Sequence, residues 1–271
     1  MSTIIVTIIV SFLLALFLGI LLGFFKKIFA VPVDEKAAKV RDVLPGANCG
    51  GCGYPGCDGF AAAVAAGTAP VDGCAAGGAA TAEKVGKVLG ISVSAENQVS
   101  VLACQGSKTC AAQRGFYNGV HSCTAAHQAV NGTKMCTFGC IGFGDCVSVC
   151  SFDALHMGED GLPHVDYSKC TGCGMCVREC PMHLFSKVPV SRKGAVALCS
   201  NRSENKASIL KNCKVGCIKC GKCERNCPEK AIKLVNGIPV VDYSLCNSCN
   251  ICVEGCPTHV LKLLEQIPIS V

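Results

Sequence analysis

The longest apolar stretch of the chain lies near its N-terminus, at residues 3–25, where no side chain is charged. Its polar members are Thr3, Thr7 and Ser11. A helix of this length extends about 35 Å, enough to cross the ~30 Å hydrocarbon core of a bilayer with some tilt. The pattern therefore predicts a membrane anchor over residues 1–27, with the lipid bilayer around it.

A cleaved signal peptide is the competing interpretation of this stretch. Signal peptides carry their positive residues before a shorter apolar region, whereas Lys26 and Lys27 follow the apolar region here. The positive-inside rule then places these lysines, and the chain after them, in the cytoplasm. We expect a single-pass protein of the cell (inner) membrane with its soluble domains on the cytoplasmic side.

Small residues recur at every fourth position of the anchor, at Ser11, Ala15, Gly19 and Gly23. Such a stripe allows a second helix to approach closely, but glycine is also simply common in membrane helices. The stripe is therefore compatible with packing against a partner helix, and equally with an anchor that has no helix partner. A short Pro-containing linker, residues 30–34, follows the anchor.

Beyond the linker the hydrophobic pattern is broken into short pieces. Residues 59–66 form a short helical pattern, with Asp58 as the predicted cap and Gly67 as the predicted end. Alternation at 232–235 and 238–241 predicts a small antiparallel hairpin. Short strands and short helices together predict small α+β modules.

Cysteine changes this picture, because it accounts for 25 of the 271 residues. Three runs, beginning at Cys170, Cys217 and Cys246, have the spacing Cys-x2-Cys-x2-Cys-x3-Cys-Pro. This is the bacterial ferredoxin pattern, in which three close thiolates hold one [4Fe-4S] cluster and the fourth reaches a neighbouring cluster. Disulfides and structural zinc are the alternatives. The odd number of cysteines, the reducing cytosol and the Cys-Pro runs favour iron–sulfur clusters.

The second half of the chain repeats itself, which indicates a tandem duplication. Residues 161–168 read GLPHVDYS and residues 237–244 read GIPVVDYS. Within the two copies, cysteines correspond at an offset of 77 and then 76 residues, and Cys123 corresponds to Cys199 by the same arithmetic. Each copy reads as a ferredoxin-like unit with two clusters.

The repeat and the anchor together divide the chain into six segments. We expect an anchor (1–27), a single-cluster domain (28–95), a connecting segment (96–125), a first ferredoxin-like domain (126–190), a linker (191–205) and a second ferredoxin-like domain (206–271).

One position departs from the repeat. Phe143 stands where the second copy has Cys220, so the first copy is one thiolate short, and Cys136 is the nearest substitute. Ser151 stands where the other runs have proline. The predicted ligand sets are Cys49, Cys52, Cys57 and Cys74 (cluster 1); Cys136, Cys140, Cys146 and Cys180 (cluster 2); Cys150, Cys170, Cys173 and Cys176 (cluster 3); Cys217, Cys220, Cys223 and Cys256 (cluster 4); Cys227, Cys246, Cys249 and Cys252 (cluster 5).

Five cysteines are left without a ligand role: Cys104, Cys110, Cys123, Cys199 and Cys213. They are compatible with buried free thiols, because cysteine packs as a small hydrophobic residue. The alternative is a sixth cluster, with Cys104, Cys123, Cys199 and Cys213 as its ligands. The sequence therefore predicts five [4Fe-4S] clusters and leaves a sixth open.

The formal net charge of +6 is misleading for this chain. Cluster ligands are thiolates, and five clusters at about −2 each bring the protein to roughly −4. We therefore expect no nucleic-acid partner. Neither a dinucleotide-binding fingerprint nor a histidine metal spacing is present in the sequence, and no catalytic site of its own is evident.

These motifs resemble one family over nearly the whole chain. The motifs in question are the anchor, NCGGCGYPGC with Cys74, VLACQG, GCIGFGDCVSVCSFDAL and GCIKCGKCERNCPEKAI. Together they are similar to the B subunit of the Rnf electron-transport complex in its long, multi-cluster form. The resemblance implies electron transfer between soluble ferredoxin and NAD through membrane and peripheral sister subunits that move Na⁺ or H⁺. A polyferredoxin of another redox complex, or one that serves a redox sensor, is the alternative.

Overall fold

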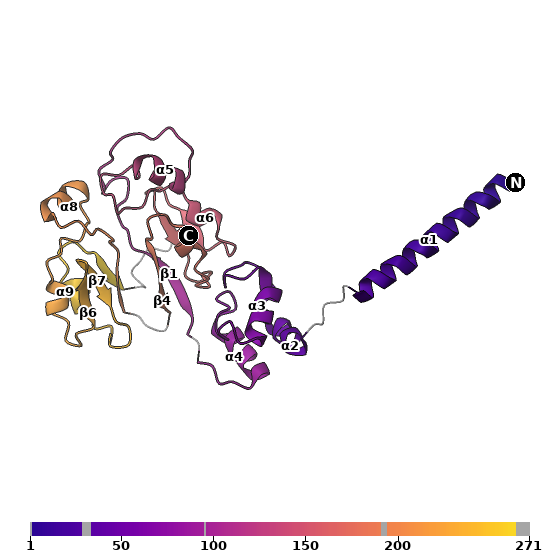
Figure 1. The fold of residues 1–271 in the computed structure, drawn as a ribbon. Helices are drawn as coiled ribbons and strands as arrows, with labels where there is room; N and C mark the ends of the chain where they lie inside the picture. The colour runs from indigo at the N-terminus through magenta and orange to yellow at the C-terminus, as the bar shows by residue number, and fades with distance from the viewer. Residues whose placement is uncertain (1, 29–33, 95, 191–193, 264–271) are drawn as a thin grey trace.

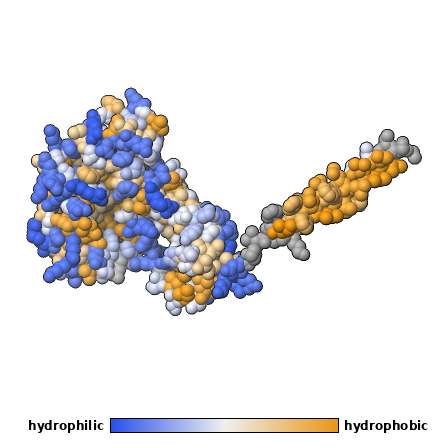
Figure 2. All heavy atoms as spheres, in the orientation of Figure 1, coloured by the Kyte–Doolittle hydropathy of each residue, from blue (hydrophilic) through white to orange (hydrophobic). Residues whose placement is uncertain are grey.

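The computed structural model describes residues 2–28, 34–94, 96–190 and 194–263. Most of the linker expected at 30–34 lies outside these ranges. Helix α1 (Ser2–Ile28) contains a 22-residue span, Ile4–Phe25, that is long and apolar enough to cross a membrane. None of this span is buried by the rest of the chain, and Figure 2 shows it as a continuous hydrophobic rod. A bilayer would cover this surface.

Three helices form the module that follows: α2 (Glu35–Val43), α3 (Gly56–Ala65) and α4 (Gly78–Leu89). Asp34 caps α2 by accepting a hydrogen bond from the Lys36 amide at 2.9 Å. Val40, Phe60 and Val85, one from each helix, are at most 1% exposed and form the centre of the module. The first cysteine loop lies beside these helices, on the side that faces the rest of the chain (Figure 1).

The helix predicted at 59–66 exists, but it starts at Gly56, and the prediction that Asp58 caps it is wrong. Asp58 lies in the first turn of α3 and pairs with Arg41 of α2 at 2.8 Å. Gly67, whose φ is +74°, follows the end of the helix as predicted.

The first ferredoxin-like unit contains two antiparallel strand pairs. Strand β1 (Gln98–Leu102) pairs with β4 (Phe185–Pro189), and β2 (Leu155–Met157) pairs with β3 (Pro163–Val165). Two short helices, α6 (Asp145–Ser148) and α7 (Met175–Glu179), carry cysteines against the strands. β1 lies in the segment expected to connect two domains (96–125), but because it pairs with β4 we assign that strand to the first unit.

The second unit repeats this arrangement. Its strands are β5 (Ala195–Ala197), which pairs with β8 (Leu261–Leu263), and β6 (Ile232–Val235), which pairs with β7 (Ile238–Val241); its short helices are α9 (Lys222–Arg225) and α10 (Ile251–Glu254). The predicted hairpin is confirmed. Asn236 and Gly237 form its turn, both with positive φ, as a two-residue hairpin turn requires.

The strand register aligns the two units differently from the cysteine offsets of 77 and 76 residues. Leu102 is opposite Phe185 and Ala197 is opposite Leu261, so β1 is the counterpart of β5. Cys104 and Cys199 each lie two residues beyond these strands and face each other in an antiparallel bridge. Cys104, not Cys123, is therefore the counterpart of Cys199.

The segment after Cys104 is longer than the corresponding segment after Cys199, and it contains the helix α5 (Cys123–Val130). The shorter segment of the second unit contains α8 (Lys206–Asn212). Figure 1 shows both helices on the same side of the two units. Cys123 thus belongs to an insertion specific to the first unit.

Candidate metal centres

The thiols of the cysteines gather in groups of four. Site 1 consists of Cys49, Cys52, Cys57 and Cys74. Burial first, and then the negative charges of the other three thiolates, raise the pKa of Cys74. The Asn48 side chain accepts a hydrogen bond from the Cys57 amide at 2.8 Å and so fixes the loop at the start of α3.

Sites 3, 4 and 5 gather the sets predicted from ferredoxin spacing: Cys150, Cys170, Cys173 and Cys176 (site 3); Cys217, Cys220, Cys223 and Cys256 (site 4); Cys227, Cys246, Cys249 and Cys252 (site 5). Burial is the first cause, and neighbouring thiolates a further cause, of the pKa of about 11 at Cys176, Cys217 and Cys252. Thiols in such surroundings stay protonated unless a cation replaces the proton.

Site 2 differs from the predicted set. One pocket is lined by Cys140, Cys146 and Cys180 as expected, but its fourth cysteine is Cys123 from α5. Burial, followed by the charges of Cys123 and Cys180, raises the pKa of Cys146 to about 12. Cys136, expected in this set, does not line the pocket. The inserted helix brings Cys123 to the place that Phe143 leaves without a thiol.

Asp145 holds Cys123 in site 2. Its carboxylate accepts hydrogen bonds from the Cys123 amide at 2.9 Å, the Thr124 amide at 3.1 Å and the Ser122 hydroxyl at 2.9 Å. Partial burial opposes ionisation, but these hydrogen bonds outweigh it and lower the pKa of Asp145. The aspartate therefore anchors the N-terminus of α5, where a negative charge is favourable.

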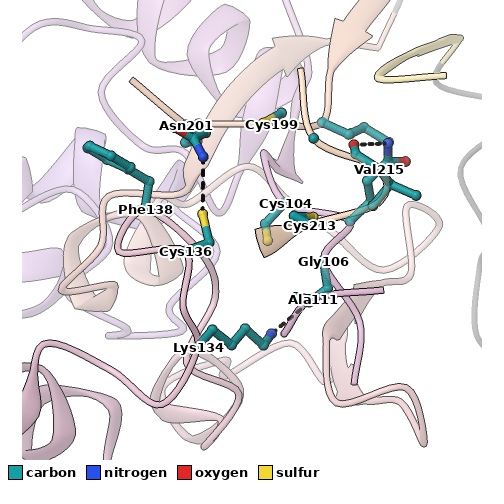
Figure 3. Close-up of a pocket in the computed structure, with 15 residues that line it drawn as sticks. Cys104, Gly106, Ala111, Lys134, Cys136, Phe138, Cys199, Asn201, Cys213 and Val215 are labelled. Carbon is teal, nitrogen blue, oxygen red and sulfur yellow. Dashed lines mark hydrogen bonds between the residues drawn. The ribbon is translucent and has the colours of Figure 1, made fainter. Parts of the chain in front are cut away.

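Four further cysteines, Cys104, Cys136, Cys199 and Cys213, line a pocket between the two ferredoxin-like units, which we call site 6 (Figure 3). Three of them belong to the sixth set considered from the sequence, and Cys136 takes the place of Cys123. Cys110 is not among the residues that line this pocket. All 25 cysteines, which fall in the described ranges, are free thiols.

Backbone amides point at the sulfurs of these groups, and the pattern repeats in both units. The amides of Ala154 and Ala231 donate to Cys150 and Cys227 at 3.4 and 3.3 Å, and the Ser100 amide donates to Cys170 at 3.4 Å. Amide donors stabilise thiolate sulfur and tune iron–sulfur clusters. Four thiols with amide donors are a donor set that fits a [4Fe-4S] cluster.

Among the described residues, no three His, Cys, Asp or Glu side chains converge closely enough to bind a single metal ion.

Neighbouring groups are in direct contact. A Cβ atom placed on Gly51, in the loop of site 1, would lie 3.2 Å from the Cβ of Cys173 in site 3. Arg178 of α7 donates a hydrogen bond to the Gly51 carbonyl at 3.1 Å. Glycine at position 51 thus allows the helical module to dock tightly on the first unit.

Three residues beside the sites were not found from the sequence: Lys134, Asp145 and Asn201. The sequence does contain a signal for the correct roles of Cys123 and Cys136. It is the similarity of Val101–Cys104 (VLAC) to Val196–Cys199 (VALC), which aligns the two units from their first strand. With that alignment, Cys123 has no counterpart in the second unit, and Cys213 remains the counterpart of Cys136.

Three family profiles match the chain. A family described as "Putative Fe-S cluster" matches residues 44–76. One family described as "4Fe-4S dicluster domain" matches residues 169–232, and a second with the same description matches residues 135–184 and 216–260. The chain therefore contains an iron–sulfur domain and two ferredoxin-like units behind an apolar helix.

Known proteins are similar over most of this length. The B subunit of the Na⁺-translocating ferredoxin:NAD⁺ oxidoreductase complex of Acetobacterium woodii is 40% identical over 81% of this chain, which spans 66% of that relative. The B subunit of the ion-translocating oxidoreductase complex of Methanosarcina acetivorans is 38% identical over 82% of this chain and 84% of its own length. The B subunit of the proton-translocating ferredoxin:NAD⁺ oxidoreductase complex of Clostridium ljungdahlii is 41% identical, over 92% of this chain and 87% of its own.

Proposed function

Because the chain belongs to the family of B subunits of ion-translocating oxidoreductase (Rnf) complexes, we propose that it relays electrons between soluble ferredoxin and NAD-reducing partner subunits. The observation that carries the proposal is the grouping of cysteine thiols in fours, behind a helix long enough to span a membrane. Other Rnf subunits are its partners in a membrane complex, and those partners would move the Na⁺ or H⁺.

A [4Fe-4S] cluster, when bound, supplies one-electron chemistry at each site. The chain supplies four thiolates per site, amide donors to sulfur, and burial. Leu184, 1% exposed, packs in the core that contains Cys140, Cys146 and Cys176. Such packing keeps water from the ligands, and burial together with hydrogen bonding to sulfur sets the reduction potential.

The docking of Gly51 on Cys173 gives the membrane-proximal module a defined place against the first unit. Arg178 fixes this contact through the Gly51 carbonyl. The anchor would then hold the whole body at the cytoplasmic face of the cell membrane, with Lys26 and Lys27 on that side.

The second unit offers the surface on which a ferredoxin would dock. Residues 206–271 carry nine Lys or Arg and five Asp or Glu, whereas residues 126–190 carry four and six. Cys220 and Cys249 are the two exposed cysteines of the chain. With two clusters at about −2 each, the second unit stays close to neutral, whereas the first becomes strongly negative. The exposed sites of the second unit therefore repel an acidic carrier less, which favours faster association there.

Two repeat-related positions carry most of this difference in charge. Asp145 and Asp153 of the first unit correspond to Lys222 and Lys230 of the second. Both lysines are exposed, and neither belongs to an ion pair within the described residues. Their charges are therefore free to face a partner.

The test is reduction of the anaerobically purified, full-length protein by reduced ferredoxin, followed by stopped-flow absorbance. We expect Lys222→Glu with Lys230→Glu to slow association by about tenfold at low salt, with the effect shrinking as salt is added. Lys206→Glu with Lys211→Glu, on α8, is the matched control and should stay near the wild-type rate.

Two results would contradict the proposal. One is a wild-type protein that ferredoxin does not reduce although its clusters are present, as expected for a polyferredoxin of another redox system. The other is equal slowing by both charge-reversal pairs, which would show that Lys222 and Lys230 have no special role in docking.

A further inference from the structure

We propose that Cys104, Cys136, Cys199 and Cys213 form a sixth [4Fe-4S] site that the two ferredoxin-like units share. The inference rests on the proposed function in one respect, namely that the other cysteine groups hold clusters. It goes beyond that function because neither unit alone contains the site. Each unit contributes two thiols.

The four cysteines surround one cavity at the junction of the units (Figure 3). A Cβ atom placed on Gly106 would lie 3.5 Å from the Cys213 sulfur and 3.7 Å from the Cys104 sulfur. Both sulfurs therefore flank the same point of the wall, and the absence of a side chain at Gly106 keeps that point open. Cys136 lies across the cavity from them in Figure 3.

Each of the four sulfurs has a hydrogen-bond donor, and such donors tune a bound cluster. The Cys140 amide donates to Cys104, and the Cys217 amide donates to Cys199, both at 3.4 Å. The side chain of Asn201, itself 5% exposed, donates to Cys136 at 3.5 Å, and the Val215 amide donates to Cys213.

A buried cation lies beside the four thiols. Lys134 is 5% exposed, lines the same cavity and donates to the Gly106 carbonyl at 2.7 Å. No ion pair in the described part of the chain includes it. A buried ammonium without a carboxylate is costly unless another negative charge lies nearby, and four thiolates around a cluster would provide that charge.

The duplication explains how the site arises. Cys104 is the counterpart of Cys199, Cys136 is the counterpart of Cys213, and the two amide-to-sulfur bonds from Cys140 and Cys217 are counterparts as well. The site therefore lies on a local pseudo-two-fold axis between the copies. Two pairs of equivalent thiols, one member of each pair from each unit, meet there.

The first test is the iron and sulfide content of the anaerobically purified full-length protein. Six sites predict about 24 iron atoms per chain, and five predict about 20. A count near 20 would overturn the sixth site alone. A count near zero, or zinc in place of iron, would instead overturn the proposed function.

Substitutions then locate the cluster. Cys136→Ser should remove about four iron atoms and one EPR-detectable spin, whereas Cys110→Ser, the matched control outside the cavity, should remove none. If Cys136→Ser does not accumulate, Lys134→Met keeps the inference testable in an intact ligand set. Lys134 also acts on Cys140 of site 2, so we expect the midpoint potentials of two clusters, those of sites 2 and 6, to fall. Retention of all iron by Cys136→Ser, or a fall at one cluster or none in Lys134→Met, would contradict the assignment.

Discussion

Replacing Asp145 with alanine removes the carboxylate that holds the N-terminus of α5 and, with it, Cys123. Ser122 remains the N-cap of α5, and loss of capping hydrogen bonds at a helix N-terminus costs about 0.5–2 kcal/mol. Here one carboxylate accepts three hydrogen bonds, at 2.9, 3.1 and 2.9 Å, so we expect a cost near the upper end, about 2 kcal/mol. That corresponds to an increase of about 30-fold in local opening of α5.

Hydrogen exchange of the intact, cluster-loaded protein measures this opening at the amides of Cys123 and Thr124. The same preparation gives the iron content, which should fall toward the loss of one cluster as α5 opens. Asp153→Ala is the matched control: Asp153 is the exposed partner of Lys169 and contacts no α5 amide. Equal exchange rates in Asp145→Ala and the wild type would refute the role given to the carboxylate.

Four further outcomes follow from the same geometry. Cys123→Ser should lose about four iron atoms, and adding Phe143→Cys should restore them by recreating the ferredoxin spacing; failure of this rescue, measured by iron content, would contradict site 2. Phe143→Cys should not rescue Cys136→Ser, because Cys136 belongs to a different cavity. Leu184→Ala should destabilise the first unit by about 2–5 kcal/mol, seen as a lower denaturant midpoint for loss of cluster absorbance, and an unchanged midpoint would speak against its place in the core. Hydrogen bonds lower the pKa of Asp145, so its contribution to the stability of α5 is complete above its unfolded pKa and is lost only as pH falls through the lower folded value. The protection of the Cys123 amide from hydrogen exchange, corrected for its intrinsic rate, should therefore be flat between about pH 5 and about pH 8.

Much of the fold could be predicted from local signals. The apolar anchor, the hairpin at Ile232–Val235 and Ile238–Val241, and the ferredoxin spacings each depend on residues close in sequence. The position of β1 could not be read in this way, because its partner β4 lies more than 80 residues later. Strand pairing at that distance is set by packing, and five residues such as Gln98–Leu102 carry little pattern of their own.

The candidate sites divide along the same line. Sites 1, 3, 4 and 5 gather cysteines whose spacing in the sequence already pairs them, but sites 2 and 6 depend on which thiol fills a place in space. Cys136 is four residues from Cys140, and proximity in sequence favoured it as the missing ligand. The structure instead brings in Cys123, whose helix is oriented by Asp145, a tertiary contact that spacing does not reveal.

Phe143, Cys123 and the cavity between the units are best understood together. In the second unit Cys220 completes its own site, so Cys213 is free to face the junction. The first unit has no thiol at position 143. If Cys136 took over that ligand role, the junction would keep only three cysteines, Cys104, Cys199 and Cys213. The insertion that carries Cys123 resolves this conflict, because it supplies the fourth thiol of site 2 and leaves Cys136 opposite Cys213. A loss at Phe143 without the insertion would therefore affect two sites at once, which is why the two changes belong together in one chain.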